Sequence, residues 1–343
     1  MPLEATLQSL RERGLVDRIV PAWRASLAAL GVAVLGLMLI TAREWGEMFH
    51  QWWDIDTYNH ILLIPFIIAW LVSMKLGELA KVKPRPWLPG LGLVAAGLAL
   101  WLIGRATDIN LIAHAGAVGA VQGAIVAVLG PRISLILALP LCFMVFFVPF
   151  GDELIPALQG ITAEIAIVLT LASGVQAVID GIYIDTLVGL FIVAEACSGV
   201  KFLIAMVTLA VLVCFTRFES WYRRAAFLAA AIVIPILANG VRAWGTIYIA
   251  QSQGVEFAAG FDHIFYGWIF FAVVVVILLG AAWRFFEREP EEEGWTNTDL
   301  SQWGWLERIE GEGVNPGLIL GATAAMALTA TILAAIVSPA AIS

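Results

Sequence analysis

Residues 198–215 read SGVKFLIAMVTLAVLVCF, and this run decides the class of protein. About 20 consecutive apolar residues let a helix cross the roughly 30 Å hydrocarbon core of a bilayer. Similar runs recur along the chain, which is 61% hydrophobic and only 13% charged. About a quarter of the residues of an ordinary soluble domain are charged. The sequence therefore predicts an all-α polytopic membrane protein with about eight to nine transmembrane helices.

The remaining apolar runs place these spans along the chain. With the first run, the predicted spans cover residues 25–41, 60–74, 88–104, 111–129, 133–150, 198–215, 225–241, 264–283 and 317–337. Residues 43–58 hold three tryptophans and are predicted to be a wet loop at the membrane interface. Residues 243–262 are predicted to be a loop on the same side of the bilayer.

The stretch 151–196 does not match a simple span. Residues 161–171 have a helical pattern but include Glu164, and residues 175–193 alternate and are rich in β-branched side chains. Irregular backbone at membrane depth is tolerated only where protein or water covers it. We expect a small re-entrant or external element here, a helix and a hairpin, before Cys197.

Basic residues favour cytoplasmic loops, and their distribution orients the spans. The expected parts are a cytoplasmic amphipathic N-terminus (1–24), a transmembrane core (25–285), an acidic cytoplasmic segment (286–316) and an additional C-terminal span (317–343). Much of the net charge of −8 lies in residues 287–312, predicted to be a solvated run. No basic stripe indicates a nucleic-acid partner, and the cysteine spacing indicates no metal site.

Three consecutive spans each deliver one reactive or charged side chain to the same face of the bilayer. These are Cys197, Arg242 and His263. Neighbouring helices pack about 8–10 Å apart, so the three side chains can meet. Taken singly, each has an ordinary structural explanation, as Cys142 and Cys214 have in packing. Ionisable groups in membrane segments are nevertheless functional candidates.

Together the three residues have a coherent chemistry. A thiolate is the nucleophilic form of cysteine, and the positive end of a helix dipole favours it. Histidine exchanges protons near neutral pH, and arginine stabilises an oxyanion or binds a carboxylate. The cluster therefore suits cleavage of an acyl bond through a thioester.

The sequences around these residues form recognisable blocks. They are Glu195-Ala196-Cys197-Ser198-Gly199-Val200, Asn239-Gly240-Val241-Arg242 and Asp262-His263-Ile264-Phe265-Tyr266-Gly267-Trp268, with Pro149-Phe150-Gly151-Asp152 and Tyr58-Asn59-His60 upstream. In this order they resemble the signature blocks of the exosortase/archaeosortase family, membrane cysteine transpeptidases, and most of all those of exosortase A-like members. The resemblance covers roughly residues 25–285.

The resemblance implies a role for each residue. Cys197 corresponds to the nucleophile, Arg242 to the stabiliser of the thiolate or transition state, and His263 to the proton shuttle. The expected substrate-binding residues are Tyr58, His60, Glu195, Ser198, Asn239 and Asp262. No metal or other cofactor is expected.

The resemblance also implies partners and a location. The expected partners are membrane lipids and exported proteins that end in a Pro-Glu-Pro-type motif, one transmembrane helix and a basic tail. The acyl group passes to an acceptor that the resemblance does not identify. We expect a multi-pass protein of the bacterial inner membrane whose active site faces the periplasm.

Two other readings of the same residues stay open. The three residues could serve another membrane thiol acyltransferase or a hydrolytic protease. A transporter or scaffold ranks last, because transporters usually place their charges near the middle of the membrane.

Overall fold

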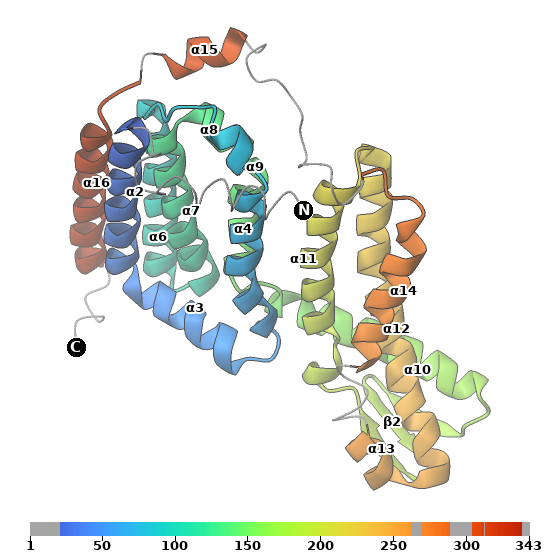
Figure 1. Ribbon diagram of the computed structural model, residues 1–343. Helices are drawn as coiled ribbons and strands as arrows, with labels where there is room; N and C mark the ends of the chain where they lie inside the picture. Colours follow the sequence, from blue (N-terminus) through green and yellow to red (C-terminus); the bar gives the residue numbers. More distant parts are fainter. Residues whose placement is uncertain (1–20, 262–268, 289–303, 312, 338–343) are drawn as a thin grey trace. The chain divides into compact units, whose positions relative to one another are not determined.

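The computed structural model describes residues 21–261, 269–288, 304–311 and 313–337. Figure 1 shows a chain built mostly of long helices. Among the described residues, seven helices are long and apolar enough to cross a membrane, or up to eight if a bent pair counts as one span. The predicted fold class, an all-α polytopic membrane protein, is therefore confirmed. The chain forms two compact units, one of residues 1–54, 61–149 and 296–343, the other of residues 55–60 and 150–295.

Close packing of two helices forms the centre of the first unit. α6 (Leu91–Thr107) and α7 (Asn110–Leu129) lie side by side, flanked by α2 (Pro21–Ile40) and α16 (Pro316–Val337) (Figure 1). A Cβ atom at Gly97 would lie 2.3 Å from the nitrogen of Ala120, and one at Gly116 would lie 2.2 Å from the nitrogen of Trp101. Glycine thus lets the two backbones approach, as small residues do between membrane helices.

The predicted wet loop at residues 43–58 is wrong for most of its length. Residues Ala42–Asp54 form helix α3, and a bend of 107° separates it from η1 (Asn59–Leu63) and α4 (Ile64–Ser73). Glu44, Met48 and Trp52 recur at the spacing of a helix and are buried. One buried face on an otherwise polar segment is the pattern of an amphipathic helix, which a search for long apolar runs misses.

The predicted span at residues 133–150 is also wrong as one continuous helix. Its residues form α8 (Pro131–Ile136), α9 (Ala138–Phe143) and the 3-10 turn η3 (Met144–Phe147). The helix is interrupted at Leu137, and Pro140 lies shortly after the break. Proline has no N–H to bond to the carbonyl four residues earlier, so it weakens a helix at this point. The short elements α5 (Leu76–Leu79) and η2 (Leu88–Gly90) complete this part.

The acidic segment is not wholly the predicted solvated run. Its described part includes α15 (Gly304–Glu310), and the Glu310 side chain is only 2% exposed. The Glu310 carboxylate lies 3.2 Å from Nη1 of Arg85 and 3.4 Å from Nε of Arg132. Trp87 donates a hydrogen bond to the carbonyl of Ile309 at 2.9 Å. These contacts attach α15 to the first unit.

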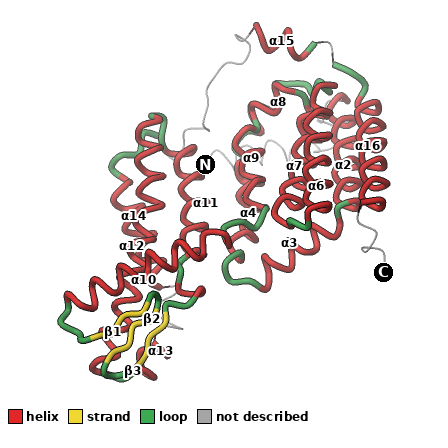
Figure 2. The backbone as a smooth tube through the Cα atoms, turned by 180° about the vertical axis from the view of Figure 1, so that it is seen from behind, coloured by secondary structure: helices red, strands yellow, loops and turns green. Residues whose placement is uncertain are grey.

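The second unit contains the stretch that precedes Cys197. It comprises η4 (Asp152–Leu154), α10 (Ile155–Ala172), the strands β1 (Ala177–Asp180), β2 (Tyr183–Thr186) and β3 (Gly189–Ile192), and η5 (Glu195–Cys197). The strands form an antiparallel sheet in the order β1-β2-β3 (Figure 2). The sequence predicted a helix and a two-stranded hairpin here, and the structure has a helix and three strands. With η4, α10 also reaches the length of a membrane span.

The predicted loop at residues 243–262 is wrong over its described residues. After α11 (Val200–Arg217), helix α12 runs from Trp221 to Gln253, and α13 (Val255–Phe261) follows it. Ile247 and Ala250 face the interior at 3% and 1% exposure, and Ile247 packs with Ile184 of the sheet. Gly254, at φ +86°, separates the two helices. Residues that pack against the sheet thus extend α12 beyond its apolar run.

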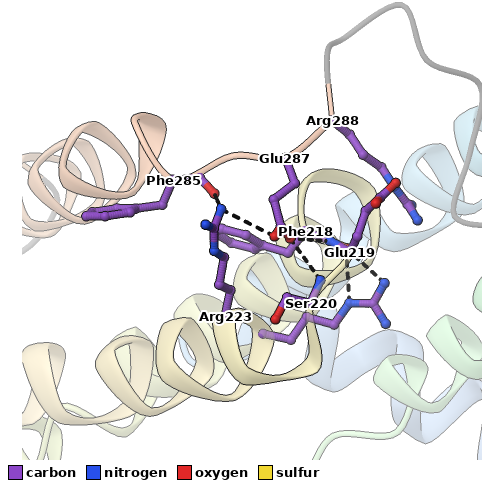
Figure 3. A network of polar contacts seen from close by, with 8 residues as sticks. Phe218, Glu219, Ser220, Arg223, Phe285, Glu287 and Arg288 are labelled. Atoms are coloured by element: carbon purple, nitrogen blue, oxygen red, sulfur yellow. Dashed lines mark hydrogen bonds and ion pairs between the residues drawn. The ribbon is translucent and has the colours of Figure 1, made fainter.

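A polar network closes the other end of α11 and α12. The carboxylate of Glu287, beyond α14 (Phe271–Trp283), accepts hydrogen bonds from the backbone N–H groups of Glu219 and Ser220 at 2.7 and 2.8 Å (Figure 3). These two bonds lower the pKa of Glu287 below its ordinary value. Arg223 lies 3.3 Å from the same carboxylate and donates to the carbonyl of Phe285. Glu287 therefore caps the start of α12.

Candidate active site

Cys197 lies on a tight turn directly before a helix. It ends η5, and α11 begins three residues later at Val200. The Cys197 backbone N–H donates to the carbonyl of Ala194 at 2.8 Å, and the thiol side chain is half-buried. Ser198, itself buried, accepts a hydrogen bond at Oγ from the N–H of Val200. This turn presents the sulfur near the N-terminal end of α11.

Buried hydrogen bonds from two other helices hold the turn. Nδ2 of Asn239, on α12, donates to the Cys197 carbonyl at 2.7 Å and to Oγ1 of Thr162, on α10, at 3.0 Å. The Thr162 hydroxyl donates in turn to the carbonyl of Ser198 at 3.5 Å. Asn239 and Thr162 are 3% and 1% exposed. Polar groups buried in this way are costly to leave unpaired, so the two side chains fix the backbone of the turn.

Gly199 is required in this turn for two reasons. Its φ of +80° lies in the left-handed region that disfavours residues with a Cβ atom. A Cβ atom built there would lie 2.7 Å from Cγ of Asn239. The close approach of α12 to the turn therefore depends on glycine at this position.

Cys197 and Arg242 line one pocket of about 300 Å³. Arg242 lies one helical turn after Asn239 on α12, so the helix that fixes the cysteine turn also carries the cation. Gln159 of α10 donates to the carbonyl of Val193, another lining residue, at 2.6 Å. The remaining lining is mostly apolar and comes from the strand β3 and its end, α12 and α13: Phe191, Ile192, Val193, Asn239, Ala243, Thr246, Ile247 and Val255.

A second pocket lies beside the same turn. It is lined by Glu195, together with Asp56, Asp152 and Lys201. Behind it, the buried Tyr58 donates its hydroxyl to Oδ1 of Asp152 at 2.7 Å. Burial and this hydrogen bond raise the pKa of Tyr58, so its phenol remains a hydrogen-bond donor.

The structure places the predicted site residues in different surroundings. Asn239 reaches the Cys197 pocket, Glu195 lines the second pocket, and Ser198 is buried in the turn. Tyr58 lines neither pocket, and neither does His60, whose Nδ1 lies 3.1 Å from the carbonyl of Thr57. His263 and Asp262 lie outside the described residues. Within the described part of the chain, no group of three or more His, Cys, Asp or Glu side chains could hold a metal ion.

Sequence reasoning missed two residues that shape the site. Thr162 and Gln159 lie in the apolar part of α10, where neither composition nor spacing distinguishes them. Only the fold shows that Thr162 lies next to Asn239, which is 77 residues away in the chain.

Comparison with known proteins identifies a family. The family model described as transmembrane exosortase matches residues 52–280, more than half of the chain, and its range includes Cys197, Asn239 and Arg242. No curated protein and no solved structure matches the chain significantly.

Proposed function

Because the chain belongs to the transmembrane exosortase family, we propose that it is a cysteine transpeptidase that cleaves the C-terminal sorting signals of exported proteins. Family membership confirms the assignment made from the signature blocks. The exosortase A-like subtype stays a prediction. The apolar helices and the family together make it a membrane protein.

One observation carries this proposal: Cys197 and Arg242 line the same pocket, beside a turn fixed by buried hydrogen bonds. In the proposed reaction the Cys197 thiolate attacks the carbonyl carbon of the scissile peptide bond. The guanidinium of Arg242 stabilises the oxyanion that forms. His263 gives a proton to the departing amine, and a thioester remains on Cys197. An acceptor nucleophile then attacks the thioester and releases the thiolate.

The proposed substrates are exported proteins with a Pro-Glu-Pro-type motif, one transmembrane helix and a basic tail. The substrate helix enters from the surrounding lipid, and the motif meets the Cys197 pocket. The proposed location is the bacterial inner membrane, with the pocket facing the periplasm. A largely apolar pocket with one cation suits a motif in which an acidic residue lies between prolines.

Processing of a co-expressed, tagged substrate tests the proposal. We expect Cys197→Ala to abolish processing while the protein stays in the membrane. Arg242→Lys should also fail, because an ammonium group does not reproduce the planar fork of a guanidinium. The matched control is Cys142→Ala, at an exposed cysteine that lines neither pocket. Normal processing by Cys197→Ala would contradict the thioester mechanism.

The fate of the thioester separates transfer from hydrolysis. Arg242 and Cys197 suit a transpeptidase, another thiol acyltransferase or a protease equally well. An acyl-enzyme trapped on Cys197 should be resolved faster by an added amine than by water if the protein is a transpeptidase. Resolution by water alone would indicate a hydrolytic protease instead.

A further inference from the structure

In the described part of the chain, the sheet beside the active site has a free edge at β3. β3 pairs with β2, and no strand pairs with its other side among the described residues. The Val193 N–H donates to the Ile182 carbonyl at 3.1 Å, directly beyond the register pair Tyr183 and Ile192. Along a strand of an antiparallel pair, the N–H and C=O groups of every second residue point to the partner strand, and those of the residues between point away from it. Val193 belongs to the first set, and so does Phe191. The peptide groups of Leu190 and Ile192 therefore point away from β2, toward the free edge.

That edge opens into the Cys197 pocket. Phe191, Ile192 and Val193 are consecutive, and all three line the pocket. Successive side chains of a strand point to opposite faces of the sheet, so the last two residues of β3, Phe191 and Ile192, both reach the pocket where it lies along the edge of the strand, and Val193 follows them there. Val255 of α13 lies against Gly189 and closes the far end. The open part of the edge thus leads from Leu190 toward Cys197.

We propose that the free edge of β3 binds the sorting motif as an added strand, so that the peptide runs along Leu190–Ile192 and its scissile bond reaches Cys197. This inference rests on the function proposed above and specifies how that substrate is held. Addition of an extended peptide to a sheet edge is a common mode of recognition, in which backbone hydrogen bonds supply the affinity. An edge that bound nothing would be a liability for aggregation.

The edge also explains a preference for prolines at alternate positions. In an extended peptide, every second residue directs both its N–H and its C=O to the same side. In a Pro-Glu-Pro segment the glutamate can direct both groups to β3, while the two proline nitrogens face away. Proline is tolerated in a strand at such positions because no hydrogen bond is lost. The side chains of Leu190 and Ile192 are 55% and 51% exposed and can contact the prolines.

Proline substitutions on the two edges of the sheet test the inference from the enzyme side. Ile192→Pro removes an N–H group that points to the free edge, and it breaks no hydrogen bond to β2. We expect it to slow processing about tenfold or more, because a hydrogen bond to the substrate is lost and the proline ring obstructs the edge. Ala177→Pro is the matched control, because the register places Ala177 on the outer edge of β1 with its N–H also facing away from β2. Processing by Ile192→Pro at the wild-type rate, or an equal loss in Ala177→Pro, would overturn the inference.

Synthetic competitor peptides test it without altering the fold of the enzyme. A Pro-Glu-Pro peptide with an N-methylated glutamate should inhibit processing about tenfold less well than its parent, because the methyl group blocks the bond to β3. Two further peptides carry alanine or N-methylalanine in place of the second proline. These two should inhibit equally well, because the nitrogen at that position faces away from β3. Equal inhibition by the parent and the N-methyl-glutamate peptide would overturn the inference.

The two proposals fail in different ways. If the wild-type protein processes no substrate of the tripartite type, the proposed function is wrong, and the edge inference falls with it. If the wild type processes such a substrate and the backbone changes have no effect, only the edge inference is wrong.

Discussion

At the scale of single residues, Cys197 is positioned through its backbone. Asn239 and Thr162 bond to the carbonyls of Cys197 and Ser198, not to the sulfur. The sulfur stays available while the turn that carries it is fixed. Preorganised geometry of this kind is what a nucleophile needs for fast attack on a bound carbonyl.

The Thr162 hydroxyl gives a sharp test of this positioning. Thr162→Val keeps the shape of the side chain but removes the donor to the Ser198 carbonyl, and an unpaired buried group costs about 1–3 kcal/mol. We expect Thr162→Val to process substrate about tenfold more slowly and to change the rate at which Cys197 is alkylated. Thr162→Ser keeps the hydroxyl and should remain near wild type in both measurements. Equal behaviour of the two variants would show that the hydroxyl has no positioning role.

The sequence singled out residues of the pocket but not all of the residues that hold the cysteine turn. Cys197 and Arg242 are chemically conspicuous in an apolar chain, and they share a pocket. Substrate binding by Asn239 stays a prediction, and its amide also makes hydrogen bonds within the protein. Thr162 gave no signal, because its partner is distant in the sequence and a threonine in an apolar helix is unremarkable. The catalytic roles of Cys197, Arg242 and His263 remain predictions.

At the scale of elements, long apolar runs predicted helices well and polar segments predicted loops badly. α6 and α7 lie where the sequence placed spans, because burial in lipid requires such runs. α3 and the last part of α12 owe their helical structure to packing on one face, which leaves a polar sequence overall. The sequence predicted a hairpin of two strands where the structure has three. A tight turn at residues 187–188 separates β2 from β3, and the sequence pattern did not indicate this turn.

The contact of α6 with α7 predicts how these helices respond to a larger residue. In Gly116→Val the new Cβ atom would meet the backbone of Trp101 at 2.2 Å, so the two helices must separate. Overpacking typically costs about 1–3 kcal/mol, and a backbone clash places this case at the upper end. We expect a clearly lower midpoint of thermal unfolding in detergent.

Gly36→Val is the matched control for this change. Gly36 lies in helix α2, and a Cβ atom there would meet nothing within 4 Å. Both substitutions place the same β-branched residue in a helix, so the difference between them isolates packing. A similar unfolding midpoint for the two variants would contradict the close helix contact.

At the scale of the whole molecule, the pocket of Cys197 belongs to one compact unit. Residues of β3, η5, α12 and α13 line it, and all of them lie in the unit of residues 55–60 and 150–295. The family match extends from residue 52 to residue 280 and so includes residues of both units. The extra span α16 lies beyond the match, where it packs with α2 and α6. The proposed chemistry therefore depends on the fold of the second unit, and the extra span belongs to the first.

The length of α11 predicts that its two ends face opposite sides of the membrane. Its 18 residues rise about 27 Å, close to the roughly 30 Å hydrocarbon core. Cys197 precedes its start, and Tyr222, which is 83% exposed, follows its end. In spheroplasts an impermeant maleimide should label Cys197 when Cys142 and Cys214 are replaced by alanine. Tyr222→Cys, in a chain with all three native cysteines replaced by alanine, should react only after the membrane is permeabilised. Labelling of both positions from the same side would show that α11 does not cross the bilayer and would remove the periplasmic placement of the active site.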